Sequence, residues 1–471
     1  MSSASSQEHI VVHVDEVELA ASDVYNDTAA DVESSVHNGV AGDPMGAKVR
    51  QRRQILIVLA AFFVTFTGCG LNFAFGVYQE LYETMSGPFA SATPATIDLI
   101  GTLAVSLMSM GAPLASAWTK TFGAREVTLA GGLILGLSNI LASFGQKLWH
   151  FILAQGVLLG IGTCLSYIPA VTVAPGWFDE RRGLAMGIVL SGTGVGGVVW
   201  APLLRSLNDS IGFRNTLRLS GGLAVVVIFL CGMVLCWDPE SERRNRAEGY
   251  SRKHPFQVPL VNWRIARSRK FFAHAVGATL QAAVYYTPVY FFSSYARTLG
   301  YSSATGANFI AASNASSATG KIAMGWIADR FGRLNTLSLC TVIAAFTALG
   351  LWLPSTVTDG SAVSRALFIT FAITYGIFAG SYVSLFPTSL VELFGVQHFA
   401  SVNGFLYMIR GFGTLVGNPI AGSFIHHSGG VVGSAMGFEK TSVMVGVTLF
   451  VAAIAVCCAR IEAAGVTKWK A

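Results

Sequence analysis

The sequence contains little charge. Asp, Glu, Lys and Arg make up 12% of its 471 residues, whereas soluble domains average about 25%. Apolar residues make up 52% and the mean hydropathy is +0.56. The composition therefore argues against an ordinary water-soluble fold. It indicates a membrane protein with many spans, each of about 20 residues.

Motifs for metals and nucleotides are also lacking. The seven cysteines lie inside apolar stretches without the paired spacing of a metal site or a disulfide framework. No G-x-x-x-x-G-K-[ST], H-E-x-x-H or G-x-S-x-G occurs. Gly192 to Gly197 matches G-x-G-x-x-G formally but lies inside an apolar segment, where close helix packing explains it better. We expect no cofactor, no metal and no enzymatic activity.

The basic residues follow the apolar segments. Although the net charge is +6, the cations flank these segments, so they describe topology and make no case for nucleic-acid binding. Residues 1–47 contain no Lys or Arg but nine acidic residues. This composition predicts a disordered acidic cytosolic tail over residues 1–50.

Twelve apolar segments follow the tail and predict an all-α membrane fold. An even number of spans places both termini on one side of the membrane. Of the 31 Lys and Arg residues, 22 lie on the flanks that share the side of the N-terminus and seven on the opposite flanks, so we expect cytoplasmic termini. The segments are 55–78, 97–118, 127–145, 149–172, 183–203, 217–237, 272–294, 304–326, 335–354, 366–388, 400–424 and 441–460.

The segments divide six and six. We expect a six-helix bundle over 51–237, a basic cytosolic linker over 238–269, a second bundle over 270–460 and a cytosolic tail over 461–471. An internal repeat supports this division, because Trp118 to Arg125 after the second segment corresponds to Gly325 to Arg333 after the eighth, with Gly123 and Gly332 209 residues apart. Two similar bundles suit alternating exposure of one central site.

The run Gly325-Trp-Ile-Ala-Asp-Arg-Phe-Gly-Arg333 resembles the G-x-x-x-D-R-x-G-R signature of the major facilitator superfamily. More narrowly, Asn314 to Arg333, with Phe73 to Tyr78 and Arg181 to Gly187, is similar to the fungal monocarboxylate-carrier-like branch. The resemblance implies two pseudo-symmetric bundles and a secondary carrier that works by alternating access. Its substrate would be a carboxylate, a vitamin such as riboflavin, or a secreted metabolite.

Three departures from the family pattern limit that inference. Lys120 occupies the acidic position of the signature in the first half. Lys321 stands where the branch usually has Arg, which keeps the charge but loses the fork that grips a carboxylate. The first span has no Lys near Phe75 to Val77, where animal lactate-type carriers have one, so lactate and pyruvate are poor candidates.

Two cations lie near mid-span, Lys321 and Arg410. Because a bare cation in hydrocarbon costs at least a few kcal/mol, each is a functional candidate that should face a cavity or a partner. We hypothesise that both hold an anionic substrate, since no carboxylate is evident at mid-span to neutralise them. Alternatively, either cation bonds to helix carbonyls and holds segments eight and eleven together.

Further substrate-contact candidates are polar or aromatic residues on the segments that line the cavity in this family. Tyr285 and Tyr286 belong to an aromatic cluster suited to stacking on a planar substrate, although neighbours on one helix cannot share a face. Interhelical hydrogen bonding explains each of these residues equally well. The others are Asn72, Gln155, Gln281, Asn314 and Tyr375.

Asp329, Arg330 and Arg333 end the eighth segment and are gate residues by resemblance. A carboxylate and guanidinium groups at helix ends can pair in one state and separate in another. The alternative, that they are plain topology charges, applies more to Arg333 than to Asp329, because an acid gains nothing from the positive-inside rule.

The sequence thus predicts a monomeric multi-pass carrier, in the plasma membrane, for a small anionic or amphipathic substrate. The midplane offers no acid, so coupling to protons carried by the substrate and facilitated diffusion are both compatible with it, as are uptake and export. A transporter-like nutrient sensor without significant flux is the alternative.

Overall fold

The computed structural model describes residues 44–83, 94–178, 181–247, 261–358, 361–424 and 435–464. The chain divides into two units, residues 1–56 and 57–471. In the first unit, the described residues form the start of α2 (Pro44–Phe73). Residues 1–43 of the predicted acidic tail lie outside the described residues, whereas residues 44–50, which we assigned to that tail, are helical.

The second unit is helical, and its described residues contain no strand. Most helices begin and end close to the predicted segments. Up to residue 232 they are the rest of α2, α3 (Phe75–Glu83), α4 (Pro94–Met110), α5 (Ala112–Phe122), α6 (Ala124–Ala142), α7 (Leu148–Phe151), η1 (Ile152–Leu158), α8 (Leu159–Val173), η2 (Ala174–Trp177), α9 (Arg182–Ile211) and α10 (Phe213–Gly232).

The predicted linker carries two short helices, and residues 248–260 of it lie outside the described part of the chain. Residues 465–471 of the predicted C-terminal tail also lie outside it. From the linker on, the helices are α11 (Pro239–Ala247), α12 (Trp263–Ala266), α13 (Arg269–Tyr285), α14 (Thr287–Thr298), α15 (Ser303–Phe331), α16 (Arg333–Thr347), η3 (Ala348–Trp352), α17 (Leu353–Val357), α18 (Ala362–Ser423), η4 (Ala435–Phe438) and α19 (Glu439–Ala464).

Eight described helices are long and apolar enough to cross a membrane, or nine if the pair α4 and α5, bent by 48°, counts as one span. This is fewer than the twelve predicted segments for physical reasons. The 62-residue α18 contains two of the segments, α15 is rich in Ser, Thr, Asn and Gly, and the seventh segment is divided between α13 and α14. The count of twelve and the cytoplasmic termini stay predictions.

Single glycines with positive φ angles separate several consecutive helices: Gly123, Gly212, Gly332 and Gly395. Gly332, with φ 95° and ψ 137°, divides α15 from α16 in a conformation that side chains disfavour. Gly395, with φ 78° and ψ 159°, divides α18 into two arms, residues 362–394 and 396–423. These turns reverse the chain with one residue, so successive helices pack beside each other.

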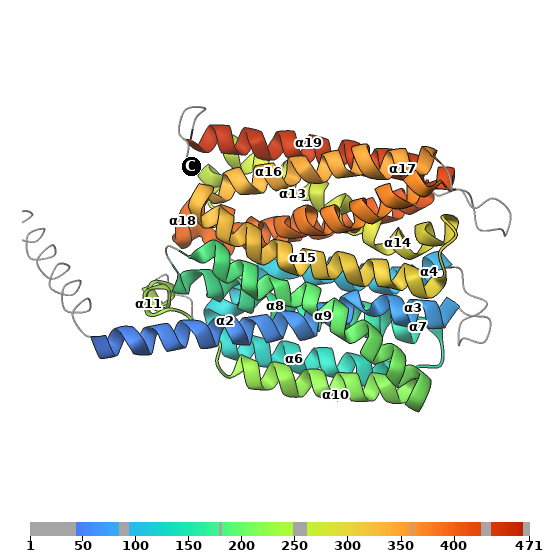
Figure 1. The fold of residues 1–471 in the computed structure, drawn as a ribbon. Helices are drawn as coiled ribbons and strands as arrows, with labels where there is room; N and C mark the ends of the chain where they lie inside the picture. The colour runs from blue at the N-terminus through green and yellow to red at the C-terminus, as the bar shows by residue number, and fades with distance from the viewer. Residues whose placement is uncertain are drawn as a thin grey trace, which may run out of the picture. The chain divides into compact units, whose positions relative to one another are not determined.

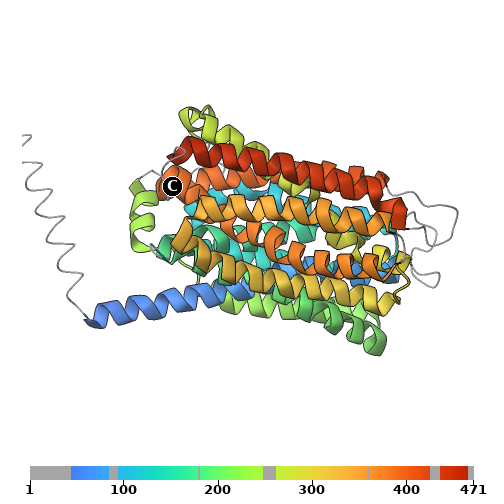
Figure 2. The same ribbon diagram turned by 45° about the horizontal axis from the view of Figure 1, so that its top comes forward.

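Helices α9 and α15 pack closely, and Figures 1 and 2 show them side by side. Small residues permit this approach. A Cβ added to Gly183 would meet the Gly325 carbonyl oxygen, and one added to Gly187 would meet that of Lys321. Gly194 lies against the Asn314 carbonyl in the same way. The interpretation of the glycine run in α9 as a helix-packing feature is therefore confirmed.

Candidate functional site

Arg410 lies in an aromatic enclosure formed by the two arms of α18. Its guanidinium carbon is 4.6 Å from the ring centre of Phe386, 5.3 Å from that of Tyr382 and 5.6 Å from that of Tyr407. The turn at Gly395 brings the arms together, so residues of one arm face residues of the other. We call Arg410, Tyr382, Phe386 and Tyr407 the Arg410 cluster. Such a face attracts a cation by about 0.5–1 kcal/mol at an exposed site and by about 2 kcal/mol or more when the cation is desolvated.

The charge of Arg410 has no carboxylate partner among the described residues. The residue is 7% exposed, and its Nη1 has no hydrogen-bond partner. Because a buried donor without an acceptor costs about 1–3 kcal/mol, and more when it is charged, this arrangement is suited to an acceptor that comes from elsewhere. A guanidinium can bind a carboxylate through two parallel N–H bonds.

Other polar groups extend this region. The hydroxyls of Tyr407 and Tyr167 lie 3.2 Å apart and connect α18 to α8. The Tyr382 hydroxyl has no partner in the structure, nor does either amide atom of Gln281, which is 1% exposed. His274 stacks on Phe386 with ring centres 5.4 Å apart. The region thus combines aromatic walls with polar groups able to orient a substrate.

Lys321 has a different environment. It is 2% exposed, and its Nζ donates a hydrogen bond of 2.6 Å to Thr193 Oγ1 on α9. In the described part of the chain, no hydrogen bond or ion pair joins it to Arg410 or to a carboxylate. The observed bond is similar to the alternative in which Lys321 holds helices together. It differs because it joins α15 to α9 and because its acceptor is a hydroxyl and not a carbonyl.

Tyr285 and Tyr286 lie at an interruption between α13 and α14. Their ring centres are 4.7 Å apart at 74°. α13 ends at Tyr285 and α14 begins at Thr287, so the two tyrosines stand at the junction of two helices. Tyr286 also lies 5.8 Å from Phe73 on α2, measured between ring centres. The two tyrosine rings meet edge to face, and their contact with a substrate stays a prediction.

The remaining substrate-contact candidates bond or pack between helices. Asn72 Nδ2 donates to the Gly68 carbonyl and to Thr163 Oγ1, and Gln155 Oε1 accepts from the Tyr82 hydroxyl at 2.9 Å. The Tyr375 hydroxyl donates to the Tyr285 carbonyl at 3.1 Å. Asn314 packs against Gly194 and Gly197. Their observed contacts are those of helix packing.

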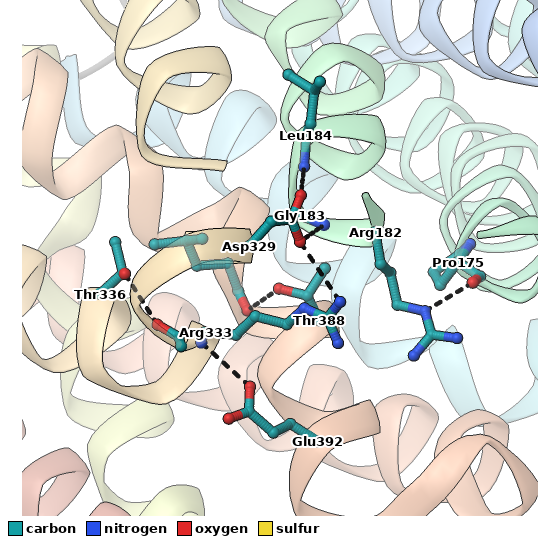
Figure 3. A network of polar contacts seen from close by, with 11 residues as sticks. Pro175, Arg182, Gly183, Leu184, Asp329, Arg333, Thr336, Thr388 and Glu392 are labelled. Carbon is teal, nitrogen blue, oxygen red and sulfur yellow. Dashed lines mark hydrogen bonds and ion pairs between the residues drawn. The ribbon is translucent and has the colours of Figure 1, made fainter. Parts of the chain in front are cut away.

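A second polar group lies where α15 meets the start of α9, as Figure 3 shows. Asp329 Oδ1 accepts from the Gly183 N–H at 2.7 Å and Oδ2 from the Leu184 N–H at 2.8 Å. These are first-turn N–H groups of α9, which lack partners within the helix. The carboxylate therefore caps a helix more than 140 residues away in sequence, with favourable charge at the N-terminus.

Arg333 and Glu392 extend this group to α16 and α18. Arg333 Nη2 lies 3.4 Å from Asp329 Oδ1, and the Arg333 N–H donates to Glu392 Oε2 at 3.2 Å. Glu392 lies between the predicted spans 366–388 and 400–424. Burial raises its pKa, while the charge and N–H of Arg333 and the N–H of Leu334 act in the opposite direction. We call Asp329, Arg333, Glu392, Gly183 and Leu184 the Asp329 network.

Arg330, the third predicted gate residue, does not bond to the Asp329 network in any contact described. Its guanidinium carbon lies 3.7 Å from the ring centre of the exposed Trp326. Residues that sequence reasoning missed are Tyr382, Phe386 and His274 around Arg410, and Glu392 as a partner of Arg333. The spacing Tyr407-x-x-Arg410 was a usable signal, because positions three apart lie on one helix face.

The sequence is similar to those of known membrane transporters. The family model described as Major Facilitator Superfamily matches residues 55–418 and 296–469. The chain is 28% identical to Aspyridones efflux protein apdF of Emericella nidulans, over 80% of this chain and 73% of that protein. It is 26% identical to Agnestins efflux protein AgnL12 of Paecilomyces divaricatus, over 79% and 81%. It is 29% identical to human Monocarboxylate transporter 11, over 69% and 67%.

Proposed function

Because the chain belongs to the major facilitator superfamily, a family of membrane transporters rather than enzymes, we propose that it exports an aromatic metabolite that carries a carboxylate. The substrate is a small molecule, and the protein is a multi-pass integral membrane protein. Efflux as the direction is supported by the names of two relatives, and a carboxylate by the name of the human one. The plasma membrane and a monomeric state belong to the same proposal.

Arg410 is the observation that carries the proposal. It is a buried cation without a carboxylate partner among the described residues, its Nη1 has no hydrogen-bond partner, and aromatic rings surround it. A substrate carboxylate would pair with its guanidinium while an aromatic ring of the substrate stacks on the walls. We assign Lys321 a secondary role in this state, because its Nζ already bonds to Thr193.

Alternating access would pass through the Asp329 network. Asp329 joins α15 of the predicted second bundle to α9 of the first. We infer that these bonds hold this end closed and break when it opens. The cation count predicts that this end is cytoplasmic. While it is closed, a bound substrate would exchange with the opposite side of the membrane, and when it opens the substrate would exchange with the cytoplasm.

The test is flux in liposomes that contain the purified protein, with a panel of labelled aromatic acids, flavins and neutral aromatic compounds. We expect saturable flux of an aromatic acid. Arg410→Lys keeps the charge but loses the fork and should raise KM by about 10- to 100-fold. Arg205→Lys, on α9 away from the cluster, is the matched control and should leave KM unchanged.

A pH gradient across the same liposomes separates proton-coupled transport from facilitated diffusion. Flux that Arg410→Lys leaves unaltered contradicts the assignment of Arg410. Flux of neutral compounds alone contradicts the anionic substrate. If the panel shows no flux although the protein binds one of its members, the nutrient-sensor alternative replaces transport.

A further inference from the structure

Two helices begin at the end of the second unit where the Asp329 network lies. One is α9, whose first N–H groups bond to Asp329. The other is the second arm of α18, which begins after Gly395. This arm packs against α5 through a small residue, as α9 does against α15: a Cβ on Gly404 would lie 3.1 Å from Pro113 Cα. The same arrangement therefore occurs twice.

The two copies differ in charge. In the internal repeat, Lys120 on α5 occupies the position that Asp329 occupies on α15. A helix N-terminus carries a partial positive charge, which a carboxylate stabilises and an ammonium does not. The start of the second α18 arm thus faces a cation where α9 faces an anion.

A narrow crevice lies between these elements and opens to solvent, with a cavity volume of about 20 Å³. Two cations line it and, among the described residues, no acid does. We call it the basic crevice. The lining residues that matter here are Lys120, Thr172, Arg244, Asn245, Val396 and Gln397.

Buried donors without partners line the basic crevice. Thr172 is 2% exposed and Asn245 is 8% exposed, and neither Thr172 Oγ1 nor Asn245 Nδ2 has a hydrogen-bond partner in the structure. Val396 and Gln397 open the second α18 arm, where first-turn N–H groups lack partners within the helix. Hydroxyl, amide and backbone donors beside two cations match the acceptor oxygens of one small oxyanion.

Two acidic groups lie near the crevice without lining it. Glu240 pairs with Arg244 at 3.0 Å across one turn of α11 and is largely exposed, so water screens this pair. Asp238 caps α11 because its Oδ2 accepts from the Ser241 N–H at 2.9 Å, while its buried Oδ1 lies against Gly176 and has no hydrogen-bond partner in the structure. Neither carboxylate provides the acceptor that Thr172 and Asn245 lack.

We propose that the basic crevice binds a phosphate group, supplied by an anionic lipid headgroup or by free phosphate. The bound group connects α5, α11 and the second arm of α18. It stabilises the closed arrangement of this end from outside the chain, as Asp329 does from within the chain at α9. The site is regulatory and separate from Arg410, so it does not depend on the identity of the transported substrate.

Thermal unfolding of the purified full-length protein tests the site in two arms. In detergent, inorganic phosphate is titrated at constant ionic strength against chloride. In nanodiscs without free phosphate, phosphatidylcholine alone is compared with mixtures that contain phosphatidylglycerol. We expect a saturable rise in the melting temperature. A rise in detergent identifies free phosphate as sufficient, and a rise confined to phosphatidylglycerol identifies the lipid headgroup.

Lys120→Asp supplies an internal carboxylate and should abolish the rise. Lys147→Asp makes the same charge change at an exposed position before α7 and should preserve it. If Lys120→Asp does not fold, Asn245→Ala should raise the half-saturating concentration by up to about tenfold, with Asn215→Ala as the exposed control. No saturable rise in either arm, or equal responses of a crevice variant and its control, overturns the proposal.

Discussion

Replacing Asp329 with Asn perturbs one end of the second unit with little change of shape. The Asp329 carboxylate, 10% exposed, accepts two backbone N–H bonds at the start of α9. A bond to a charged acceptor contributes about 1.5–3 kcal/mol and one to a neutral acceptor about 0.5–1.5 kcal/mol. Asn has one oxygen for two donors, so the variant should lose about 2–3 kcal/mol of closed-state stability, or about 30- to 150-fold in population.

Two measurements test this magnitude. Nitroxide labels at Glu126→Cys on α6 and Arg330→Cys on α15, with exposed Cys458 replaced by Ser, report the separation of the helix ends. Asp329→Asn should increase the long-distance population. In transport, turnover should fall more than substrate affinity, because the substituted residue lies at the helix ends and not at Arg410.

Asp209→Asn is the matched control, since Asp209 is an exposed carboxylate near the other end of α9. The reasoning fails if both variants give the same distance distribution. It also fails if Asp329→Asn reduces turnover and affinity by equal factors, because a group that acts only on the closed state has no reason to weaken binding equally.

Three further substitutions follow from the helix contacts. Gly332→Ala forces a side chain into a glycine conformation and should lower the free energy of unfolding by about 1–3 kcal/mol. Gly222→Ala, at a helical position with open space around it, should not lower it. Equal losses in a denaturant titration contradict this prediction. Gly187→Ala places a methyl against the Lys321 carbonyl and should increase the distance between the nitroxides at positions 126 and 330. An unchanged distance shows that α9 and α15 do not need a glycine for their close packing. Thr193→Val removes the hydroxyl that accepts from Lys321 and should lower the melting temperature, whereas Thr193→Ser keeps this hydroxyl and should not. Equal melting temperatures for both variants refute a stabilising bond.

The sequence predicted the helical segments well because apolar runs are local signals. It singled out Arg410 because a mid-span cation is costly wherever it lies. The enclosure of Arg410 was not predictable, since Tyr382 and Phe386 reach it only through the turn at Gly395. The prediction of this site thus stopped at one residue.

Contacts between groups that are distant in the sequence were also not predictable from it. The signature predicted Asp329 at a helix end, yet its partners are the backbone N–H groups of Gly183 and Leu184, which every residue type except proline provides. Thr193 and Lys321 are 128 positions apart, and no pattern of side chains relates them. The substrate hypothesis for Lys321 was therefore made without the bond to Thr193, which supports a role for Lys321 in helix packing.

The bond between Lys321 and Thr193 would make the hydrogen-bonding capacity of a buried cation depend on conformation. It joins α15 to α9, the same two helices that Asp329 holds together. When these helices separate, the ammonium loses its hydroxyl acceptor and needs another. An anion is the strongest replacement, so the proposed open state would bind an anion more strongly at Lys321 than the closed state, in which one of the three ammonium donors is used by Thr193. Capture and release of the substrate would then differ in affinity without any change in the residues around Arg410.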